Sequence, residues 1–272
     1  IEKNLILMNQ LKKEPIIILD FGSQYTQLIA RRIREFNVYS EVVSPQIDLN
    51  SLKKRNPRAI ILSGGPSSVF SDDAPKFDLD ILNMAIPILG ICYGLHLLVH
   101  HNGGIVNSTG KGEYGFAEVK FIKGSNITEH ISDKSNVWMS HMDQVTIVPD
   151  GWQVIATSSN GVIAGLINQE QNIIATQFHP EVSHTEEGGQ LLKNFIFKIA
   201  KCEKNWTPNN FIKEQVKIIK EESGNENILV GVSGGVDSTV MACLINKSVG
   251  TKCTAVLIDH GLLRKAEAKN CV

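Results

Sequence analysis

The sequence predicts an α/β protein with an open, mostly parallel, twisted sheet that carries helices on both faces, followed by the beginning of a second α/β domain. Two observations support this fold class. The first is that short apolar runs, at residues 16–19, 38–43, 59–62 and 86–89, alternate with amphipathic stretches. This alternation is typical of parallel strands joined by helices. The second is a restart of the same alternation at residues 228–232, after a polar stretch at 205–210.

The first domain is expected to begin with the strand at 16–19 and a helix over residues 25–35. Leu28, Ile29 and Ile33 recur at helical spacing in this segment and predict its buried face. The three remaining apolar runs follow as strands. Because ligands of such sheets bind beyond the carboxyl ends of the strands, the turns that end these runs are the first places to seek a site.

The pattern changes between residues 113 and 178, where short apolar runs are separated by Gly, Asn, Asp and Pro. Such runs predict mixed or antiparallel strands, here at residues 117–122, 145–148, 154–157, 162–167 and 173–178. A helix over 188–201 is expected to close the first domain.

The second domain is expected to begin with an amphipathic helix at 211–222, a strand at 228–232, a helix that includes 240–246 and a strand at 253–258. The predicted organisation is an N-terminal extension at 1–13, a first domain at 14–201, a linker and linking helix at 202–222, and a truncated second domain at 223–272. The chain starts with Ile1, Met8 is a plausible true start, and the last residues stop inside an expected helix, so we expect a fragment.

The composition excludes several function classes. The chain has 272 residues, is 42% hydrophobic and carries a formal net charge of −1, so no charge bias favours nucleic acid or a membrane surface. Its apolar runs are far shorter than the ~18 residues of a membrane helix. The five cysteines show neither C-x-x-C pairs nor zinc spacing, which fits reduced thiols in the cytoplasm.

The chemistry of the first domain is indicated by Cys92, in the segment Gly90-Ile91-Cys92-Tyr93-Gly94, and by His179 and Glu181. A strand, a tight turn and a helix N-terminus hold a nucleophile exposed. A free thiol has a pKa near ~8.5, so it needs a base. His179 and Glu181 project on one side of a strand and can supply that base and its orienter. Taken alone, Cys92 could be a buried apolar side chain, and His179 and Glu181 could be a pair on the surface. The occurrence of all three in this pattern favours catalysis.

A second candidate site lies in the loop between the strand at 228–232 and the following helix. This loop reads Ser233, Gly234, Gly235, Val236, Asp237 and Ser238. Its N–H groups and the helix N-terminus predict an anion cradle. It is not a Walker A loop, because the G-x-x-x-x-G-K-[ST] pattern is absent. Asp237 is the candidate ligand for Mg²⁺, which prefers carboxylate and phosphate oxygens.

Over residues 14–270 the chain resembles enzymes that join a Cys-His-Glu (class I) glutamine amidotransferase domain, here residues 14–201, to an ATP pyrophosphatase domain. The segments that carry the resemblance are Asp20-Phe21-Gly22-Ser23-Gln24-Tyr25, Leu62-Ser63-Gly64-Gly65-Pro66, the cysteine turn, Gln177-Phe178-His179-Pro180-Glu181, and the loop at 233–238. The resemblance implies hydrolysis of the glutamine side-chain amide, without a cofactor at that site. It places the oxyanion donors at the N–H of Tyr93 and in the Gly64-Gly65 loop.

Two positions depart from the family's pattern. His96 stands where the family usually has a Gln that helps hold the substrate glutamine, and Met142 stands where it usually has Gly. Met142 would be strained if its backbone needs a positive φ. His184 matches the family pattern too and is expected on a surface that faces the second domain.

The loop at 233–238 resembles the pyrophosphate loop of ATP pyrophosphatases, which are adenine-nucleotide hydrolase-like. The segment at 257–265, with Arg264, resembles the part of that fold where adenosine sits, and His260 departs from its usual pattern. The combined resemblance implies glutamine, ATP with Mg²⁺ and xanthosine monophosphate (XMP) as substrates: ammonia from glutamine aminates adenylylated XMP and gives GMP. It also implies a homodimer. Two alternatives stay open, a glutaminase subunit of anthranilate or CTP synthesis, and a non-catalytic regulatory module.

Overall fold

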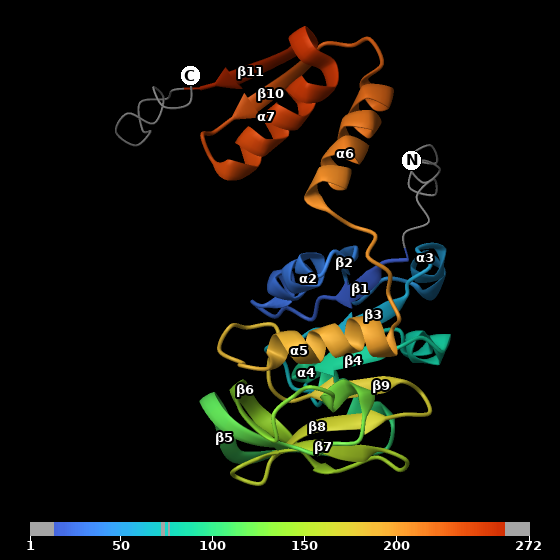
Figure 1. The fold of residues 1–272 in the computed structure, drawn as a ribbon, viewed down its shortest axis with the longest axis vertical. Coiled ribbons are helices and arrows are strands. Elements are labelled where there is room, and N and C mark those ends of the chain that lie inside the picture. Colours follow the sequence, from blue (N-terminus) through green and yellow to red (C-terminus); the bar gives the residue numbers. More distant parts are fainter. Residues whose placement is uncertain (1–13, 72–73, 76, 259–272) are drawn as a thin grey trace. The chain divides into compact units, whose positions relative to one another are not determined.

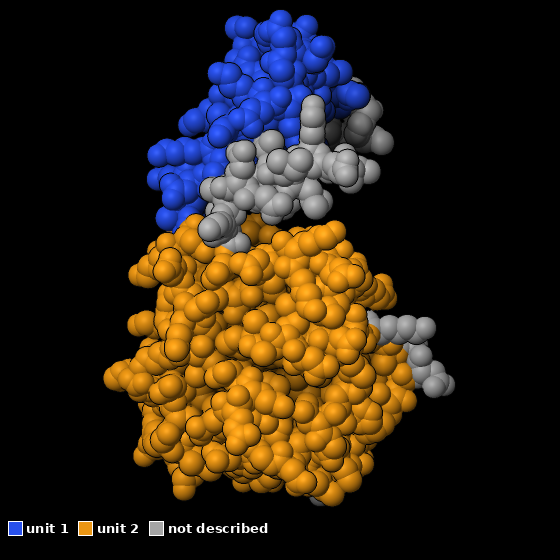
Figure 2. All heavy atoms as spheres, turned by 90° about the vertical axis from the view of Figure 1, so that its right-hand side faces the viewer, with its two compact units in different colours: residues 1–11, 206–272 blue, residues 12–205 orange. Residues whose placement is uncertain are grey.

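The computed structural model describes residues 14–71, 74–75 and 77–258, and it divides into two compact units (Figure 2). The larger unit comprises residues 12–205. The described part of the smaller unit covers residues 206–258. The predicted extension at 1–13, with Met8, lies outside the described residues.

A nine-stranded sheet forms the centre of the larger unit, in the order β2-β1-β3-β4-β9-β8-β7-β5-β6 (Figure 1). The strands β2, β1, β3, β4 and β9 are parallel, and β8, β7, β5 and β6 extend the sheet with antiparallel pairs. Their bounds are β1 Ile16–Leu19, β2 Ser40–Val43, β3 Ala59–Leu62, β4 Ile88–Ile91, β5 Ile105–Phe121, β6 Lys134–Ile147, β7 Gln153–Ser158, β8 Ile163–Asn168 and β9 Ile173–Thr176. The predicted parallel sheet and its antiparallel extension are therefore confirmed.

Helices cover both faces of the sheet and enclose two separate cores. The helical segments of this unit are α2 Thr26–Glu35, α3 Leu49–Lys54, η1 Leu79–Met84, α4 Tyr93–His101, η2 Asn126–Thr128, α5 Gly188–Asn194 and η3 Phe195–Ile199. Strand β1 shows how the cores are divided. Ile16 and Ile18 pack with α2 and α5, whereas Ile17 and Leu19 pack with α3 and α4. Alternate residues of a strand point to opposite faces, so a strand buried on both sides is apolar throughout.

Several predicted boundaries differ from the structure. Strand β4 continues beyond the expected end at residue 89, because Gly90 and Ile91 still pair with β9. Helix α4 starts at Tyr93, so the turn between β4 and α4 consists of one residue. The runs at 117–122 and 145–148 belong to the long β5–β6 hairpin, whose pairing shifts between Ser108 and Glu113. The helix expected over 188–201 becomes a π-helix at η3, where the Ala200 N–H donates to the Phe195 carbonyl oxygen.

The smaller unit contains a β–α–β element preceded by a helix. Its elements are α6 Pro208–Ser223, β10 Ile228–Val232, α7 Val236–Val249, η4 Gly250–Lys252 and β11 Cys253–Leu257, with β10 and β11 parallel. Helix α6 begins inside the expected linker, because the Thr207 hydroxyl accepts from the Asn210 N–H and Pro208 occupies the first turn, both favourable start signals. Among the helices of residues 14–258 that the structure describes, none is long and apolar enough to cross a membrane.

Candidate active site

Cys92 alone forms the turn between β4 and α4, with φ +52° and ψ −101°. A non-glycine residue in this region costs of order 1–3 kcal/mol, so the surroundings must hold it. The Cys92 N–H donates to the Thr176 carbonyl oxygen at 2.7 Å, and the Cys92 carbonyl accepts from the His96 N–H at 3.1 Å. The side chain is only 5% exposed. The strained elbow is thus fixed between a parallel strand and the first turn of a helix.

Glycine at position 94 allows this elbow to form. A Cβ at Gly94 would lie 2.4 Å from the Leu62 carbonyl oxygen, and one at Gly90 would lie 2.7 Å from the Gly94 backbone. Both distances are shorter than any tolerable contact, so α4 can pack onto β3 and β4 only without these side chains.

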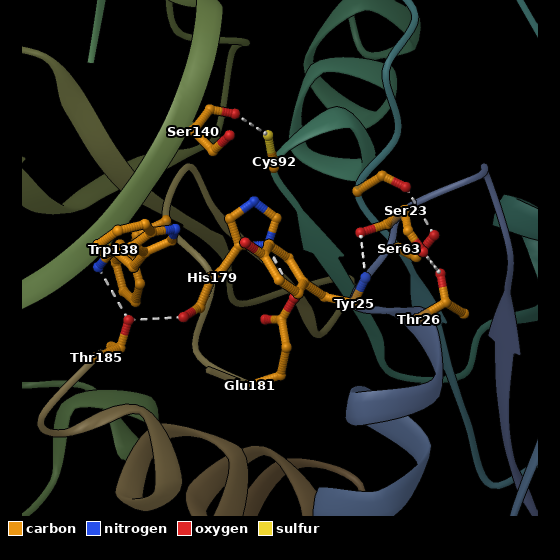
Figure 3. A network of polar contacts seen from close by, with 12 residues as sticks. Ser23, Tyr25, Thr26, Ser63, Cys92, Trp138, Ser140, His179, Glu181 and Thr185 are labelled. Atoms are coloured by element: carbon orange, nitrogen blue, oxygen red, sulfur yellow. Dashed lines mark hydrogen bonds and ion pairs between the residues drawn. The ribbon is translucent and has the colours of Figure 1, made fainter. Parts of the chain in front are cut away.

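His179 and Glu181 follow β9 and form a buried pair. The His179 Nδ1 atom lies 2.8 Å from Glu181 Oε1, and the Glu181 side chain is fully buried. Figure 3 shows the imidazole of His179 between the Cys92 sulfur and the Glu181 carboxylate. The edge of the Tyr25 ring packs against the imidazole at 5.1 Å between centroids.

The backbone around this pair is held from two sides. The Arg32 Nε–H of α2 donates to the Glu181 carbonyl oxygen at 2.9 Å. The Thr185 hydroxyl donates to the His179 carbonyl oxygen at 2.6 Å and accepts from the Trp138 N–H of β6 at 3.0 Å (Figure 3). The contacts of Arg32 and Trp138 were not expected from the sequence, since they join segments far apart in the chain.

The electrostatics favour a protonated His179. Burial disfavours the imidazolium, but the negative charge of Glu181 and the hydrogen bonds of His179 with Cys92 and Glu181 outweigh it and raise the pKa of His179 to about 10. An imidazolium beside a thiol stabilises the thiolate, the nucleophilic form of cysteine. The pair therefore supplies both a positive charge and a proton donor next to the sulfur.

Two more groups contact the sulfur directly. The Cys92 thiol donates to the Ser140 carbonyl oxygen of β6 at 3.6 Å, and the Gln177 side-chain N–H donates to Cys92 Sγ at 3.8 Å. Gln177 precedes His179 by two residues, and this spacing was the one signal in the sequence that could have placed it near the cysteine.

Of the residues expected to hold the oxyanion, Tyr93 directly follows Cys92 in the chain and Gly64 lies close to the imidazole. Tyr93 is the first residue of α4, where backbone N–H groups lack intrahelical acceptors. A Cβ at Gly64 would lie 3.1 Å from His179 Cε1, and one at Gly65 would lie 2.6 Å from the Phe21 carbonyl oxygen. The glycine loop after β3 therefore passes close to the imidazole, and a larger residue would not fit there.

The two departures from the family pattern have different surroundings. His96 is buried in α4, and its Nε2 atom lies 2.9 Å from Gln177 Oε1. Met142 lies in β6, is about half exposed and does not have a positive φ, so the expected strain is absent. The exposed His184 stacks on Trp138 at 4.6 Å between ring centroids.

The loop at 233–238 connects β10 to α7 in the smaller unit. Gly235 caps the helix, Gly234 has φ +81°, and Asp237 lies in the first turn of α7. The Ser238 hydroxyl accepts from the Ser233 N–H at 3.1 Å and lies 3.2 Å from the Ser233 hydroxyl. The two serines thus fold the loop around the helix start. The segment after residue 258, with His260 and Arg264, lies outside the described residues.

Fold and site together define an α/β protein with a cysteine on a strained strand–turn–helix elbow and a buried His-Glu pair beside it. Residues 17–199 match the model of the class I glutamine amidotransferase family, and residues 208–272 match the PP-loop domain. The chain belongs to the class I glutamine amidotransferase family.

Curated relatives extend the match over both units. The chain is 50% identical over 260 residues to the glutamine-hydrolysing GMP synthase of Fusobacterium nucleatum and 47% identical over 259 residues to that of Brachyspira hyodysenteriae. These alignments cover 95% of this chain but 51% and 50% of the relatives. The chain therefore spans about half the length of the curated relatives that it matches.

Solved structures match the larger unit. A protein from Thermoplasma acidophilum, described as a candidate GMP synthase subunit, is 30% identical, has a TM-score of 0.62 and aligns over 70% of this chain and 96% of its own. A glutamine amidotransferase from Thermotoga maritima, 16% identical with a TM-score of 0.56 over 70% of this chain and 100% of its own, supports the fold.

Proposed function

We propose that the larger unit hydrolyses glutamine to glutamate and ammonia. The observation that carries this proposal is Cys92 on its strained elbow beside the buried His179–Glu181 pair, in a chain of the class I amidotransferase family. Cys92 is the nucleophile, His179 is the general acid and base, and Glu181 orients the imidazole and stabilises its positive charge.

In the first half of the reaction, the Cys92 thiolate attacks the carboxamide carbon of glutamine and forms a tetrahedral intermediate. The imidazolium of His179 gives its proton to the departing nitrogen, and the C–N bond breaks to release ammonia. A glutamyl thioester remains on Cys92. In the second half, His179 takes a proton from water, the resulting hydroxide attacks the thioester, and the thiolate leaves as glutamate forms.

The negative oxygen of both tetrahedral intermediates needs donors. The Tyr93 N–H at the start of α4 and the backbone of Gly64 and Gly65 are our candidates. Tyr93 directly follows Cys92, Gly64 lies close to the imidazole, and a Cβ at Gly65 would meet the Phe21 carbonyl oxygen. One such donor typically contributes about 10²–10³ in rate. His96 is expected to influence glutamine binding from inside α4.

The smaller unit is proposed to bind the phosphates of ATP at residues 233–238. The match to the PP-loop domain and the serine pair that folds this loop support the proposal. Asp237 would hold Mg²⁺. Mg²⁺ usually binds through one or two carboxylates and substrate phosphates, so a single carboxylate in this loop fits. Among the residues that the structure describes, no group of three or more His, Cys, Asp or Glu side chains could hold a metal ion. Mg²⁺ would neutralise the phosphate charge.

For the longer protein, we propose synthesis of GMP from XMP, ATP and glutamine, with ammonia passing from the larger unit to adenylylated XMP. The names of the curated relatives and the joint presence of both units support this assignment. A homodimer in the cytoplasm completes the proposal. The free cysteines Cys92, Cys202, Cys243 and Cys253 are consistent with a reducing compartment.

The test is release of ammonia from glutamine by the 272-residue chain, its Cys92→Ala variant and a Cys202→Ala control. Burial raises the pKa of the Cys202 thiol to about 11, so that thiol is unreactive at neutral pH. We expect ammonia from the wild type and the control, and none from Cys92→Ala. Release that persists in Cys92→Ala overturns the nucleophile assignment. No release from the wild type leaves a regulatory module or a glutaminase that needs the rest of the longer protein, and adding an intact synthetase domain with ATP and XMP separates these two.

A further inference from the structure

A chain of side-chain hydrogen bonds reaches the Cys92 sulfur from the side of α4 and β9. His96 Nε2 lies 2.9 Å from Gln177 Oε1, and the Nε2–H of the same Gln177 amide donates to Cys92 Sγ at 3.8 Å. Both side chains lie in the interior, since His96 is 4% exposed and Gln177 is 0% exposed. Water therefore does not compete for these contacts.

The direction of this chain follows from the chemistry of its members. The Oε1 atom of Gln177 can only accept, so the Nε2 of His96 must carry the hydrogen. Burial lowers the pKa of His96, although its bond to Gln177 and the charge of Asp143 oppose that effect. His96 is thus a neutral imidazole with one N–H, and this N–H is given to Gln177. Because this hydrogen bond fixes the Oε1 atom of Gln177, the amide nitrogen on the other side of the same group points toward the Cys92 sulfur.

The two contacts of the sulfur favour different ionisation states. The Ser140 carbonyl oxygen accepts a hydrogen from the thiol, and an acceptor in that position disfavours the thiolate. The Gln177 N–H is a donor, which favours the thiolate and forms a stronger, charge-assisted bond with it. When the thiol proton leaves, the donor from Gln177 remains.

We propose that Gln177 stabilises the Cys92 thiolate and that His96 is a positioning residue that holds the Gln177 amide in the donating orientation. The proposal rests on the proposed function of Cys92 as the nucleophile. It gives a role to the histidine that replaces the family's usual Gln at position 96.

The charged and titratable groups around His96 and the His179–Glu181 pair are not replaced in any variant below. They are His179 and Glu181, which follow β9, and His141 and Asp143 of β6. Gln177→Met and the His96 variants therefore leave these charges unchanged, whereas Gln177→Glu adds one.

The experiment measures the rate at which iodoacetamide alkylates Cys92 as a function of pH, followed by mass spectrometry of the Cys92 peptide in the full chain. Gln177→Met keeps the length of the side chain but removes the donor. We expect the midpoint of the pH–rate profile to rise by about one unit, so that alkylation well below the midpoint is about tenfold slower. Gln177→Glu, which places a carboxylate at the sulfur, is the second variant and should shift the midpoint further upward.

The positioning role of His96 is tested by exchange and rescue. His96→Phe keeps a ring without a donor and should shift the midpoint in the same direction. His96→Gln restores an N–H donor and should return the profile toward the wild type. His100→Phe, at an exposed position of the same helix, is the matched control and should leave the profile unchanged.

An unchanged midpoint in both Gln177 variants, with a native thermal unfolding transition, overturns the inference about Gln177. A shift in His96→Phe that His96→Gln does not reverse overturns the inference about His96. Alkylation needs no glutamine turnover, so the result stands apart from the proposed function. Absent ammonia release with a shifted profile refutes the proposed function alone.

Discussion

The replacement Glu181→Gln removes a charge from the buried pair while keeping the shape of the side chain. The carboxylate lies 2.8 Å from the imidazole and is fully buried. A Gln at this position can still accept a hydrogen bond, but it cannot attract the imidazolium. It can also present an N–H to His179 Nδ1 and so favour the wrong tautomer.

The magnitude follows from the geometry of the pair. With charge centres about 4 Å apart and an effective dielectric constant of about 20, the attraction is about 4 kcal/mol. This energy corresponds to about three pH units in the ionisation of His179. Its loss therefore removes most of the rise that takes the pKa of His179 to about 10.

The assay is kcat/KM for glutamine hydrolysis from pH 6 to 10. We expect a loss of about 10²–10³-fold at neutral pH, because His179 no longer holds its proton beside the thiolate. Glu170→Gln, which removes one exposed carboxylate, is the control for net charge. A variant within about threefold of the wild type, with an unaltered pH profile, would refute the reasoning.

Three further predictions concern packing, pH and the phosphate loop. Gly94→Ala should destabilise the chain by about 1–3 kcal/mol, because its Cβ would meet a β3 carbonyl oxygen. Gly189→Ala is the control, since the added Cβ would lie in open space and should not change the stability. Equal thermal unfolding temperatures for the two variants would contradict this prediction. Protonation of His179, whose pKa is raised above 6.5, contributes stability that is fully present below about pH 6.5 and is lost as pH rises through about 10. Thermal unfolding of Glu181→Gln should therefore depend less on pH over that range, and an equal dependence argues against the shift. Ser238→Ala should weaken binding of Mg²⁺–pyrophosphate about tenfold or more by calorimetry, and unchanged affinity counts against the loop assignment.

Much of the fold can be predicted from local patterns. The apolar runs at 16–19 and 59–62 coincide with β1 and β3, because strands buried on both faces have continuous apolar sequences. The run at 228–232 coincides with β10, although only Val230 of that strand is buried. The β5–β6 hairpin is longer than predicted. Its segment from Ser108 to Glu113 is polar and rich in glycine, and the register shift there breaks the period-two pattern on which such predictions depend.

The candidate site also combines features that the local sequence predicts with contacts that it does not predict. The spacing of His179 and Glu181 predicts their pairing, and the glycines beside Cys92 predict its turn, since these features depend on neighbours in the chain. The contacts from Ser140 and Gln177 to the sulfur depend on how β6 and β9 lie against β4. Such contacts follow from tertiary packing; of the two, only the Gln177 contact has a local signal, the two-residue spacing of Gln177 and His179.

The most direct test of the account is to trap the glutamyl thioester. The chain is mixed with glutamine, quenched in acid within the first turnover and digested, and the mass of each cysteine-containing peptide is measured. We expect a glutamyl group on the peptide that contains Cys92. A glutamyl group on another cysteine, or ammonia release with no labelled cysteine at any quench time, would contradict it.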